Sequence, residues 1–501
     1  MFAKYSRRIA VFFMFVLAAI LIRLPLFNIS KISTDEHTFL NMGYDVAIGN
    51  LPYIHLWDNK PPLLFFIMAP IAVLADHHIW VVRLIAALCD ATTALLVKSI
   101  ADQLFGKRAA HWLCAAWCFV ALTLTAVGGA LMSETIALPL MMGAARLFSP
   151  QKPNATACFW GGVLLGAATL VRLLPAFPAA ALVVTLVADG VVRRDRQRLQ
   201  SALLVISGGI LAGLAVSLPY AVAGQFDMLV RSAIQAPIAY AHDSSGESFP
   251  AMLRHSSRFL VLTLLLGLAG GVCSLFWRAS DAGRLREQDV RILAMSAATV
   301  LSIAIGQAWQ HYLALPMGFA SVGVASLLDW TADRLERRIA NAALSVIGIV
   351  LVTMAGYSAV QRGKAPDVMA QTRALLRERM RPGDSLYLTT DYGLYWLLGK
   401  SPPHPIVTHA GNLFRPQVFR VLPYGIRSSG ELMRVILSRK PTWIVFDDED
   451  GPRYFNDPEV GRVLLPVLGS EYVVQPSPAH RLIYRLRDTR ASPGAIPPLR
   501  N

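Results

Sequence analysis

Two adjacent carboxylates, Asp35 and Glu36, follow the first apolar segment of the chain by a few residues. Ser33 stands just before a predicted helix over residues 34–48, in which apolar side chains recur every three or four positions. Ser33 can cap this helix, and Glu36 at the third helical position would complete a capping box. Glu36 thus has a structural explanation, whereas Asp35 is either a solvated first-turn carboxylate or a functional group held on a rigid element.

Lys60 is the second residue whose surroundings suggest chemistry. It lies in Trp57-Asp58-Asn59-Lys60-Pro61-Pro62-Leu63, at the entrance of a short apolar stretch, Pro61–Leu74. A lysine at such an edge can simply extend its ammonium toward water. Alternatively, a compact ammonium beside a rigid Pro-Pro turn is well placed to bind a phosphate. The residues alone favour neither interpretation.

The composition indicates that these residues belong to an integral membrane protein. Hydrophobic residues make up 54% of the 501 positions and charged residues only 16%. A net charge of +15 could suggest nucleic-acid binding, but the cations cluster between apolar runs, where they set membrane topology, so nucleic-acid binding is rejected. The five cysteines form no CxxC pair, so they indicate neither a disulfide framework nor a zinc site.

Eleven apolar segments are predicted to cross the membrane. The first, Ile9–Phe27, has no small-x-small cleavage site after it and is interpreted as an uncleaved anchor. The others are 79–101, 111–128, 134–148, 156–172, 174–190, 201–222, 258–277, 291–307, 312–329 and 340–360. Pro61–Leu74 is short for a span, and we expect it and the helix over 34–48 to lie on the outer membrane surface.

The distribution of cations predicts the topology. With the N-terminus in the cytoplasm, seventeen lysines and arginines fall in cytoplasmic segments. The outer loops between spans hold only Lys31, Lys60, Arg172, Arg231 and Arg254. The positive-inside rule therefore places loops 28–78 and 223–257, and everything beyond residue 360, on the outer side.

The predicted organisation is a transmembrane domain over 1–360 and a separate periplasmic domain over 361–501. Within this tail, helices and strands are expected to alternate in a small α/β unit. The expected elements are helices at Asp367–Met380 and Glu431–Ser438 and strands at Ser385–Thr390 and Trp443–Phe446.

The sequence resembles a known superfamily in its first outer loop. The resemblance lies in the Asp-Glu pair after the first span, the Gly-x-x-Pro-Tyr turn from Gly49 to Tyr53, and Lys-Pro-Pro before Val82-Arg83-Leu84. These features are similar to those of the GT-C membrane glycosyltransferases, in the branch of protein O-mannosyltransferases and lipid A aminoarabinose transferases. The resemblance implies a polytopic helical fold of about eleven transmembrane helices with surface helices in the first outer loop.

The resemblance also implies roles for matching residues. Asp35 corresponds to the catalytic carboxylate that deprotonates the acceptor as it attacks the sugar with inversion, and Glu36 completes that pair. Lys60 corresponds to a position that contacts the lipid-linked phosphate, and Tyr53 is assigned to substrate binding. These roles are chemically coherent, because an inverting displacement needs a base for the acceptor and cationic support for the departing phosphate.

Further candidates lie deeper in the chain, each with a structural alternative. Glu134 begins a span, either as a residue favoured by the helix dipole or as a functional acid that contacts substrate. Arg172 and Arg83, near the outer ends of spans, are either interfacial cations or phosphate ligands. His311 and Tyr312, in a polar turn that also contains Gln307 and Gln310, belong to an aromatic belt or contact the donor phosphate or sugar. The acidic run Asp447-Asp448-Glu449-Asp450 could bind a cation or a sugar, but a solvated loop is the favoured interpretation.

The predicted function is that of an inverting glycosyltransferase of the bacterial inner membrane. It would transfer a sugar from a polyprenyl-phosphate donor to a glycan, lipid or protein acceptor. Membrane lipids would surround the protein. No cofactor is expected, and no metal, since the sequence shows no clear metal-ligand spacing. The alternative is a transporter or flippase of a lipid-linked saccharide, although no internal repeat is visible. A non-catalytic scaffold for polymer assembly would have no need for Asp35 together with Lys60.

Overall fold

The computed structural model describes residues 2–108, 110–241, 247–282, 286–305, 308–447, 451–478 and 480–487. The chain forms two compact units, each assembled from separate stretches. The helical unit comprises Met1–Asn28, Trp80–Leu218 and Ser244–Ala365, and the outer-loop unit comprises Ile29–Ile79, Pro219–Asp243 and Pro366–Asn501. This division differs from a single boundary at residue 360, because the first outer loop packs with the tail.

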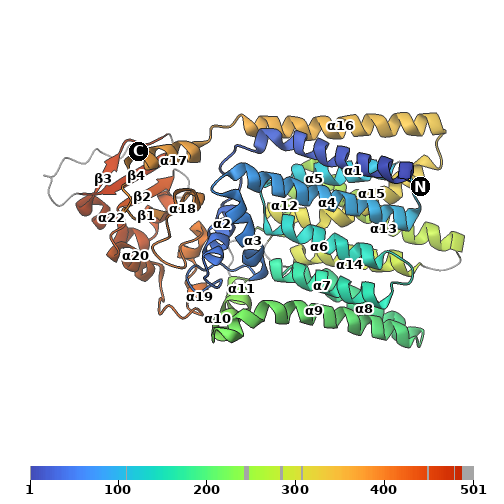
Figure 1. Cartoon of the computed structure of the whole chain (residues 1–501), viewed down its shortest axis with the longest axis horizontal. Helices are drawn as coiled ribbons and strands as arrows, with labels where there is room; N and C mark the ends of the chain where they lie inside the picture. Colours follow the sequence, from blue (N-terminus) through green and yellow to red (C-terminus); the bar gives the residue numbers. More distant parts are fainter. Residues whose placement is uncertain are drawn as a thin grey trace. The chain divides into compact units, whose positions relative to one another are not determined.

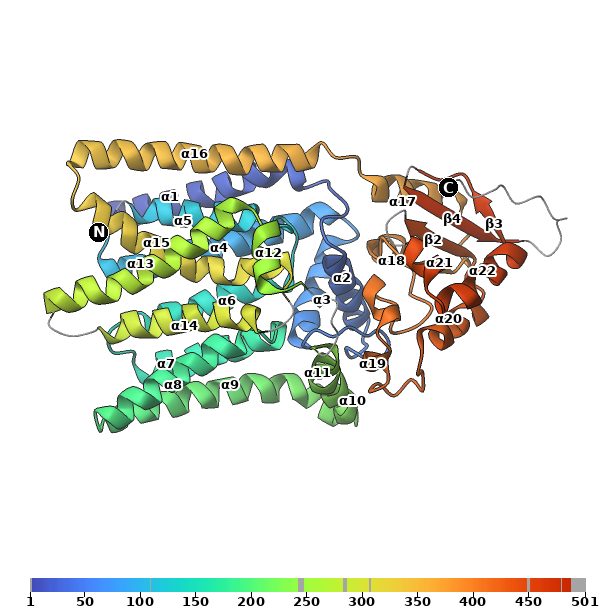
Figure 2. The same ribbon diagram turned by 180° about the vertical axis from the view of Figure 1, so that it is seen from behind.

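Each of the eleven predicted spans coincides with a helix in the structure. These helices are α1 (Phe2–Arg23), α4 (Ile79–Phe105), α5 (His111–Thr123), α6 (Ser133–Phe148), α7 (Ala155–Val171), α8 (Ala176–Val192), α9 (Arg196–Val222), α13 (Arg258–Ala282), α14 (Glu287–Ala304), α15 (Ala314–Ala332) and α16 (Arg337–Gly363). Figures 1 and 2 show them running side by side as a bundle. A short helix, α12 (Phe249–His255), precedes α13.

Six helical segments among the described residues are long and apolar enough to cross a membrane. They begin at Ile9, Ile79, Arg196, Arg258, Gln310 and Arg338. Helices α5, α7 and α8 are apolar but shorter, so the total of eleven crossings stays a prediction. Helix α3 (Leu63–Ala75) has 13 residues. At about 1.5 Å per residue it is too short for ~30 Å of hydrocarbon, as expected for the Pro61–Leu74 segment.

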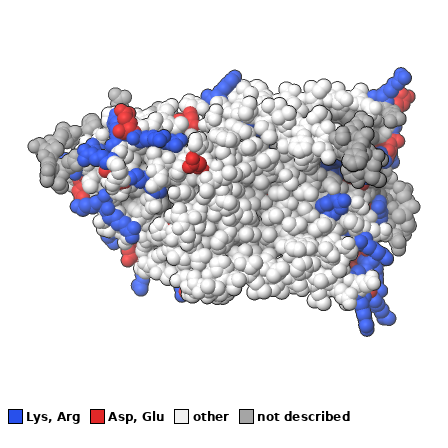
Figure 3. Space-filling view, viewed as in Figure 1, with Lys and Arg blue, Asp and Glu red and all other residues white. Residues whose placement is uncertain are grey.

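The outward faces of the bundle are apolar. Large side chains such as Phe13, Leu17, Leu214, Leu218 and Ile349 are exposed on α1, α9 and α16. Figure 3 shows that, over the helical unit, charged side chains on the face in view gather mainly toward the helix ends and leave a broad uncharged surface. An apolar surface of this extent is unfavourable in water and suits contact with lipid.

Close backbone contact stabilises one pair of helices in this bundle. A Cβ atom built at Gly267 of α13 would lie 2.4 Å from Cα of Ala320 on α15. A Cβ atom at Gly323 would lie 1.9 Å from the carbonyl oxygen of Gly267. Only glycine permits this approach, which supplies van der Waals packing where lipid removes most of the hydrophobic driving force between helices.

A buried ion pair joins α1 and α4 inside the helical unit. Nη2 of Arg23 lies 2.6 Å from Oδ2 of Asp90, with both side chains at most 5% exposed. The same guanidinium donates a 3.0 Å hydrogen bond to the Thr123 hydroxyl on α5. Arg362 of α16 donates to the carbonyl oxygen of Gly128 at 2.8 Å, which ties the last long helix to the loop after α5. Hydropathy alone indicated none of these contacts.

A four-stranded sheet forms the centre of the tail. The strands β1 (Leu386–Leu388), β2 (Trp443–Asp447), β3 (Tyr472–Gln475) and β4 (Arg481–Leu486) lie in the order β1-β2-β4-β3. β1 and β2 are parallel, and the other pairs are antiparallel. Helices α17 (Val368–Arg379), α20 (Ser429–Ser438) and α22 (Val460–Glu471) accompany the sheet, with α20 beside α22 in Figure 2. The two predicted helices and two predicted strands are found, whereas β3 and β4 were not predicted.

The first outer loop contains two packed helices, α2 (Thr34–Ala47) and α3. A Cβ atom at Gly43 of α2 would lie 2.6 Å from Cβ of Met68, so this glycine lets the helices approach closely. Ser33 occupies the N-cap position of α2, but its side chain makes no capping hydrogen bond. The predicted capping box is therefore wrong, and the Glu36 side chain is instead buried completely.

Candidate functional site

The adjacent carboxylates of the first outer loop occupy different environments. Asp35, in the first turn of α2, keeps 19% of its side chain exposed. Its Oδ1 atom lies 3.0 Å from Nε2 of His409. Glu36 is fully buried on the same helix. Asp35 is therefore the member of the pair that a molecule outside the unit could reach.

The ammonium of Lys60 is held close to the protein. Nζ donates to Oδ1 of Asn59 at 2.9 Å, lies 3.9 Å from Oδ1 of Asp58, and sits 5.8 Å from the centroid of the Phe39 ring. Oδ1 of Asp58 also accepts the Lys60 backbone amide at 3.1 Å, an Asx turn that fixes the loop before the two prolines. The Lys60 side chain remains 19% exposed. It thus combines a defined position with an accessible charge.

Segments far along the chain anchor the loop that carries Lys60. The Trp57 backbone amide donates to the carbonyl oxygen of Pro405 at 2.9 Å, and the Thr408 hydroxyl donates to the carbonyl oxygen of Trp57 at 2.6 Å. The buried Trp57 indole donates to the Ser232 hydroxyl at 3.1 Å. These bonds come from the second outer loop and from the tail, so three distant stretches build one local structure.

Tyr53 supports the same loop from inside. Its backbone adopts φ 74°, a left-handed conformation that is unusual for a bulky residue and needs outside support. The fully buried ring stacks on Tyr220, and its hydroxyl donates to the carbonyl oxygen of Lys60 at 2.5 Å. Burial raises the pKa of Tyr53 well above its ordinary value, which keeps this hydroxyl a donor. The predicted contact of Tyr53 with substrate stays a prediction.

In the helical unit, Glu134 and Arg172 form a buried ion pair. Glu134 lies in the first turn of α6, and Arg172 follows the end of α7. Nη1 of Arg172 is 2.9 Å from Oε1 of Glu134, with side chains 5% and 1% exposed. The Ser133 hydroxyl accepts from Nη1 of Arg172 at 2.7 Å and donates to Oε2 of Glu134 at 2.9 Å. The carboxylate therefore balances the arginine charge.

His311 and Tyr312 join this pair. Both belong to a short 3-10 helix, Gln310–Leu313. Nε2 of His311 lies 3.6 Å from Oε1 of Glu134, and Cζ of Arg172 lies 4.2 Å from the centroid of the Tyr312 ring. Four predicted site residues from three separate stretches of the chain thus form one cluster, which we call the Glu134 cluster. Arg83 is also buried, on α4. Gln307, Asp448, Glu449 and Asp450 lie outside the described residues.

The residues that sequence reasoning missed are His409 and its neighbour Thr408. Neither belongs to a recognisable motif, and only a contact across most of the chain length brings them to the first outer loop. Among the described residues, no group of three or more His, Cys, Asp or Glu side chains could hold a metal ion. The expectation of a metal-independent site stays a prediction.

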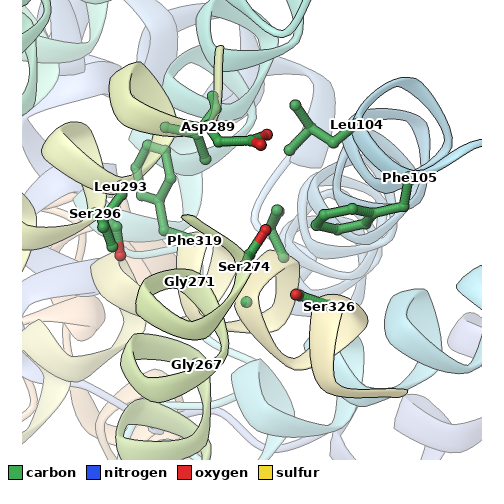
Figure 4. Close-up of a pocket in the computed structure, with 13 residues that line it drawn as sticks. Leu104, Phe105, Gly267, Gly271, Ser274, Asp289, Leu293, Ser296, Phe319 and Ser326 are labelled. Carbon is green, nitrogen blue, oxygen red and sulfur yellow. The ribbon is translucent and has the colours of Figure 1, made fainter. Parts of the chain in front are cut away.

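A separate pocket in the helical unit contains none of the predicted site residues. It lies between the end of α4 and helices α13, α14 and α15. Figure 4 shows the Asp289 carboxylate pointing into it, with the Phe105 ring and the Ser274 and Ser326 hydroxyls around the same space. The Glu134 cluster is formed by other residues, so this pocket is not part of it.

The helical bundle with its candidate spans and the two packed helices of the first outer loop can be compared with known folds. The fold is similar to the GT-C membrane fold of the solved structures described below. Residues 59–222 match the family model described as dolichyl-phosphate-mannose-protein mannosyltransferase. A search among curated proteins finds no significant match.

Two solved structures illustrate the similarity of fold. ArnT from Cupriavidus metallidurans bound to undecaprenyl phosphate is 15% identical over 96% of this chain and 99% of that chain, with a TM-score of 0.66. The oligosaccharyltransferase AglB from Archaeoglobus fulgidus, in complex with an inhibitory peptide and a dolichol-phosphate, is 11% identical. That match covers 98% of this chain and 75% of that chain, with a TM-score of 0.60.

Proposed function

We propose that the protein is an inverting glycosyltransferase that moves one sugar from a polyprenyl-phosphate donor to an acceptor in the cell envelope. The fold and the family-model match over residues 59–222 support this proposal. Two structures of similar fold contain a polyprenyl phosphate, undecaprenyl phosphate in one and dolichol-phosphate in the other. The reaction would take place at the outer face of the bacterial inner membrane, with lipid A, a polysaccharide, a lipid or a protein as acceptor.

The position of Asp35 carries the proposal. Its carboxylate is accessible, whereas the helix that holds it is buried along much of its length. A base on a rigid element loses little freedom when the acceptor binds, which favours reaction. We assign Asp35 the role of general base, which takes the proton of the acceptor hydroxyl.

The bonds made and broken follow from that assignment. The acceptor oxygen attacks the anomeric carbon as its proton passes to Asp35, and a new glycosidic bond forms. The bond between the anomeric carbon and the phosphate oxygen breaks, so the polyprenyl phosphate departs with the electron pair. Attack opposite the leaving group inverts the anomeric configuration.

The departing phosphate gains negative charge and needs cationic support. Lys60 supplies an ammonium that Asn59 and Asp58 hold in place but leave partly exposed. We therefore assign Lys60 to the donor phosphate. In the helical unit, Glu134 holds the guanidinium of Arg172 in its orientation, and Arg172 and His311 stay predicted phosphate ligands of that unit.

Transfer by the purified protein tests this function. The protein is reconstituted in liposomes with a radiolabelled polyprenyl-phosphate sugar and an acceptor fraction from the cell envelope. Transfer of label to the acceptor, absent with Asp35→Asn, is expected. Movement of intact donor between leaflets without transfer, equally fast in Asp35→Asn, would instead identify a flippase. Mass spectrometry of envelope glycans with and without the gene then identifies the sugar and acceptor.

A further inference from the structure

The tail of the chain reaches the carboxylate to which the catalytic role is assigned. Asp35, Thr38 and Asn41 stand at three-residue intervals on α2, so they share one side of the helix. Nε2 of His409 lies 3.0 Å from Asp35. The Thr38 hydroxyl donates to the carbonyl oxygen of Thr408 at 2.7 Å. One turn farther, Nδ2 of Asn41 donates to the carbonyl oxygen of Tyr392 at 2.9 Å.

His409 itself is held on more than one side. Its Nδ1 accepts the backbone amide of Gly411 at 3.1 Å, which caps the 3-10 helix Ala410–Phe414. Its ring lies nearly parallel to that of Tyr392, with 6.4 Å between centroids and 8° between planes. The preceding residue, Thr408, is buried and bonded to both Thr38 and Trp57. The imidazole therefore has little freedom to turn.

These contacts determine which ring nitrogen carries the proton. Because Nδ1 accepts a hydrogen bond from an amide, the hydrogen of a neutral imidazole must be on Nε2. Nε2, with its hydrogen, lies 3.0 Å from Oδ1 of Asp35. With Nδ1 bonded to the backbone and Nε2 facing Asp35, the ring offers no lone pair to a substrate proton. His409 is thus suited to orient a base and not to act as one.

We propose that His409 is a positioning residue for Asp35, so that the C-terminal tail completes the catalytic group of the first outer loop. The Nε2 atom contacts Oδ1 of the Asp35 carboxylate and so restricts the orientation of the group that takes the acceptor proton. This inference rests on the proposed role of Asp35 as general base. It gives the tail a direct part in the reaction.

Three substitutions distinguish three features of His409: the N–H donor at Nε2, the ring that lies against Tyr392, and the acceptor for the Gly411 amide. His409→Gln keeps an amide N–H near the position of Nε2. His409→Asn keeps an acceptor for the Gly411 amide, and asparagine is favoured at such caps, but its side chain is too short to reach Asp35. His409→Phe keeps a ring against Tyr392 but has no donor. All three are assayed as full-length protein for kcat and donor KM, with folding checked by thermal denaturation.

We expect His409→Asn and His409→Phe each to lower kcat by about 10- to 100-fold, as for other misplaced catalytic groups, with donor KM little changed. His409→Gln should retain most of kcat. If His409→Phe does not fold, the comparison of Asn with Gln carries the test. Full activity of His409→Asn, or equal losses in Asn and Gln variants, would overturn the proposal.

Asp35→Asn distinguishes failure of this inference from failure of the proposed function. Adding His409→Asn to Asp35→Asn should cause no further loss, because the two side chains act as one unit. An active Asp35→Asn variant would show that Asp35 is not the general base. An inactive Asp35→Asn variant beside a fully active His409→Asn variant would overturn only the role of His409.

Discussion

The guanidinium of Arg172 lies 2.9 Å from the carboxylate of Glu134, and both side chains are almost completely buried. Ser133 bridges the two, and His311 and Tyr312 approach from a third loop. Considered separately, each residue had two interpretations, a helix-dipole or functional acid for Glu134 and an interfacial cation or phosphate ligand for Arg172. Their pairing explains how each is tolerated away from water, since an unpaired buried charge is strongly unfavourable.

This pairing predicts a stability loss that depends on both partners. Glu134→Ala leaves Arg172 buried without its carboxylate and should lower the free energy of unfolding by about 3–5 kcal/mol. The double variant Glu134→Ala, Arg172→Met should lose less than the sum of the single variants, because it removes the uncompensated charge. Thermal denaturation in detergent measures the stability loss of each single variant and of the double variant. Strictly additive losses would mean that the pair is not coupled.

Asp35→Asn should abolish transfer while the protein stays folded and binds donor. Asp35 is partly exposed, so its removal alters few buried contacts, whereas loss of a general base lowers the rate by about 10²–10⁴. The measurement is turnover with donor at saturation, accompanied by a donor-binding titration. Asp45→Asn, a change to a buried α2 carboxylate bonded to His55 and Asn50, is the matched control and should retain turnover. Near-normal turnover of Asp35→Asn would exclude Asp35 as the base.

Lys60→Ala should weaken donor binding and slow phosphate departure, and Lys60→Arg should retain part of both. Arginine keeps the charge but replaces a compact ammonium with a planar fork that fits the Asn59 and Asp58 contacts less well. Titration of purified protein with polyprenyl phosphate measures the change in binding, and turnover measures the change in phosphate departure. A lysine that only extends toward water would tolerate alanine, with donor affinity and turnover unchanged.

The outer location of the tail is tested by cysteine labelling in a cysteine-free background, which is needed because Cys273 is exposed. A cysteine at the exposed position Ser385 should react with an impermeant reagent on the periplasmic side of intact inner membranes. A cysteine at Arg194, in the turn between α8 and α9, should react only after lysis. The reverse pattern would overturn the topology derived from cation distribution.

The helices of the bundle could be located from the sequence because hydropathy is a local property. Each segment of about 20 apolar residues is helical wherever it lies in lipid, since its backbone groups must bond to one another. The same reasoning separated the short α3 from the spans. Turn residues likewise marked β1, α20 and β2. Neither α22 nor β3 was predicted, and no turn separates them, because Glu471 ends the helix and Tyr472 begins the strand.

Residue type and position selected Asp35, Lys60, Glu134, Arg172 and His311 as candidates, but not their partners. Only the tertiary structure joined Glu134 to Arg172 and His311, placed Tyr53 beneath the Lys60 loop, and showed that Glu36 is buried instead of completing a cap. Only it brought His409 to Asp35. The physical reason is that periodicity and charge describe neighbours within a few residues. A contact between opposite ends of a chain depends on how all the intervening elements pack.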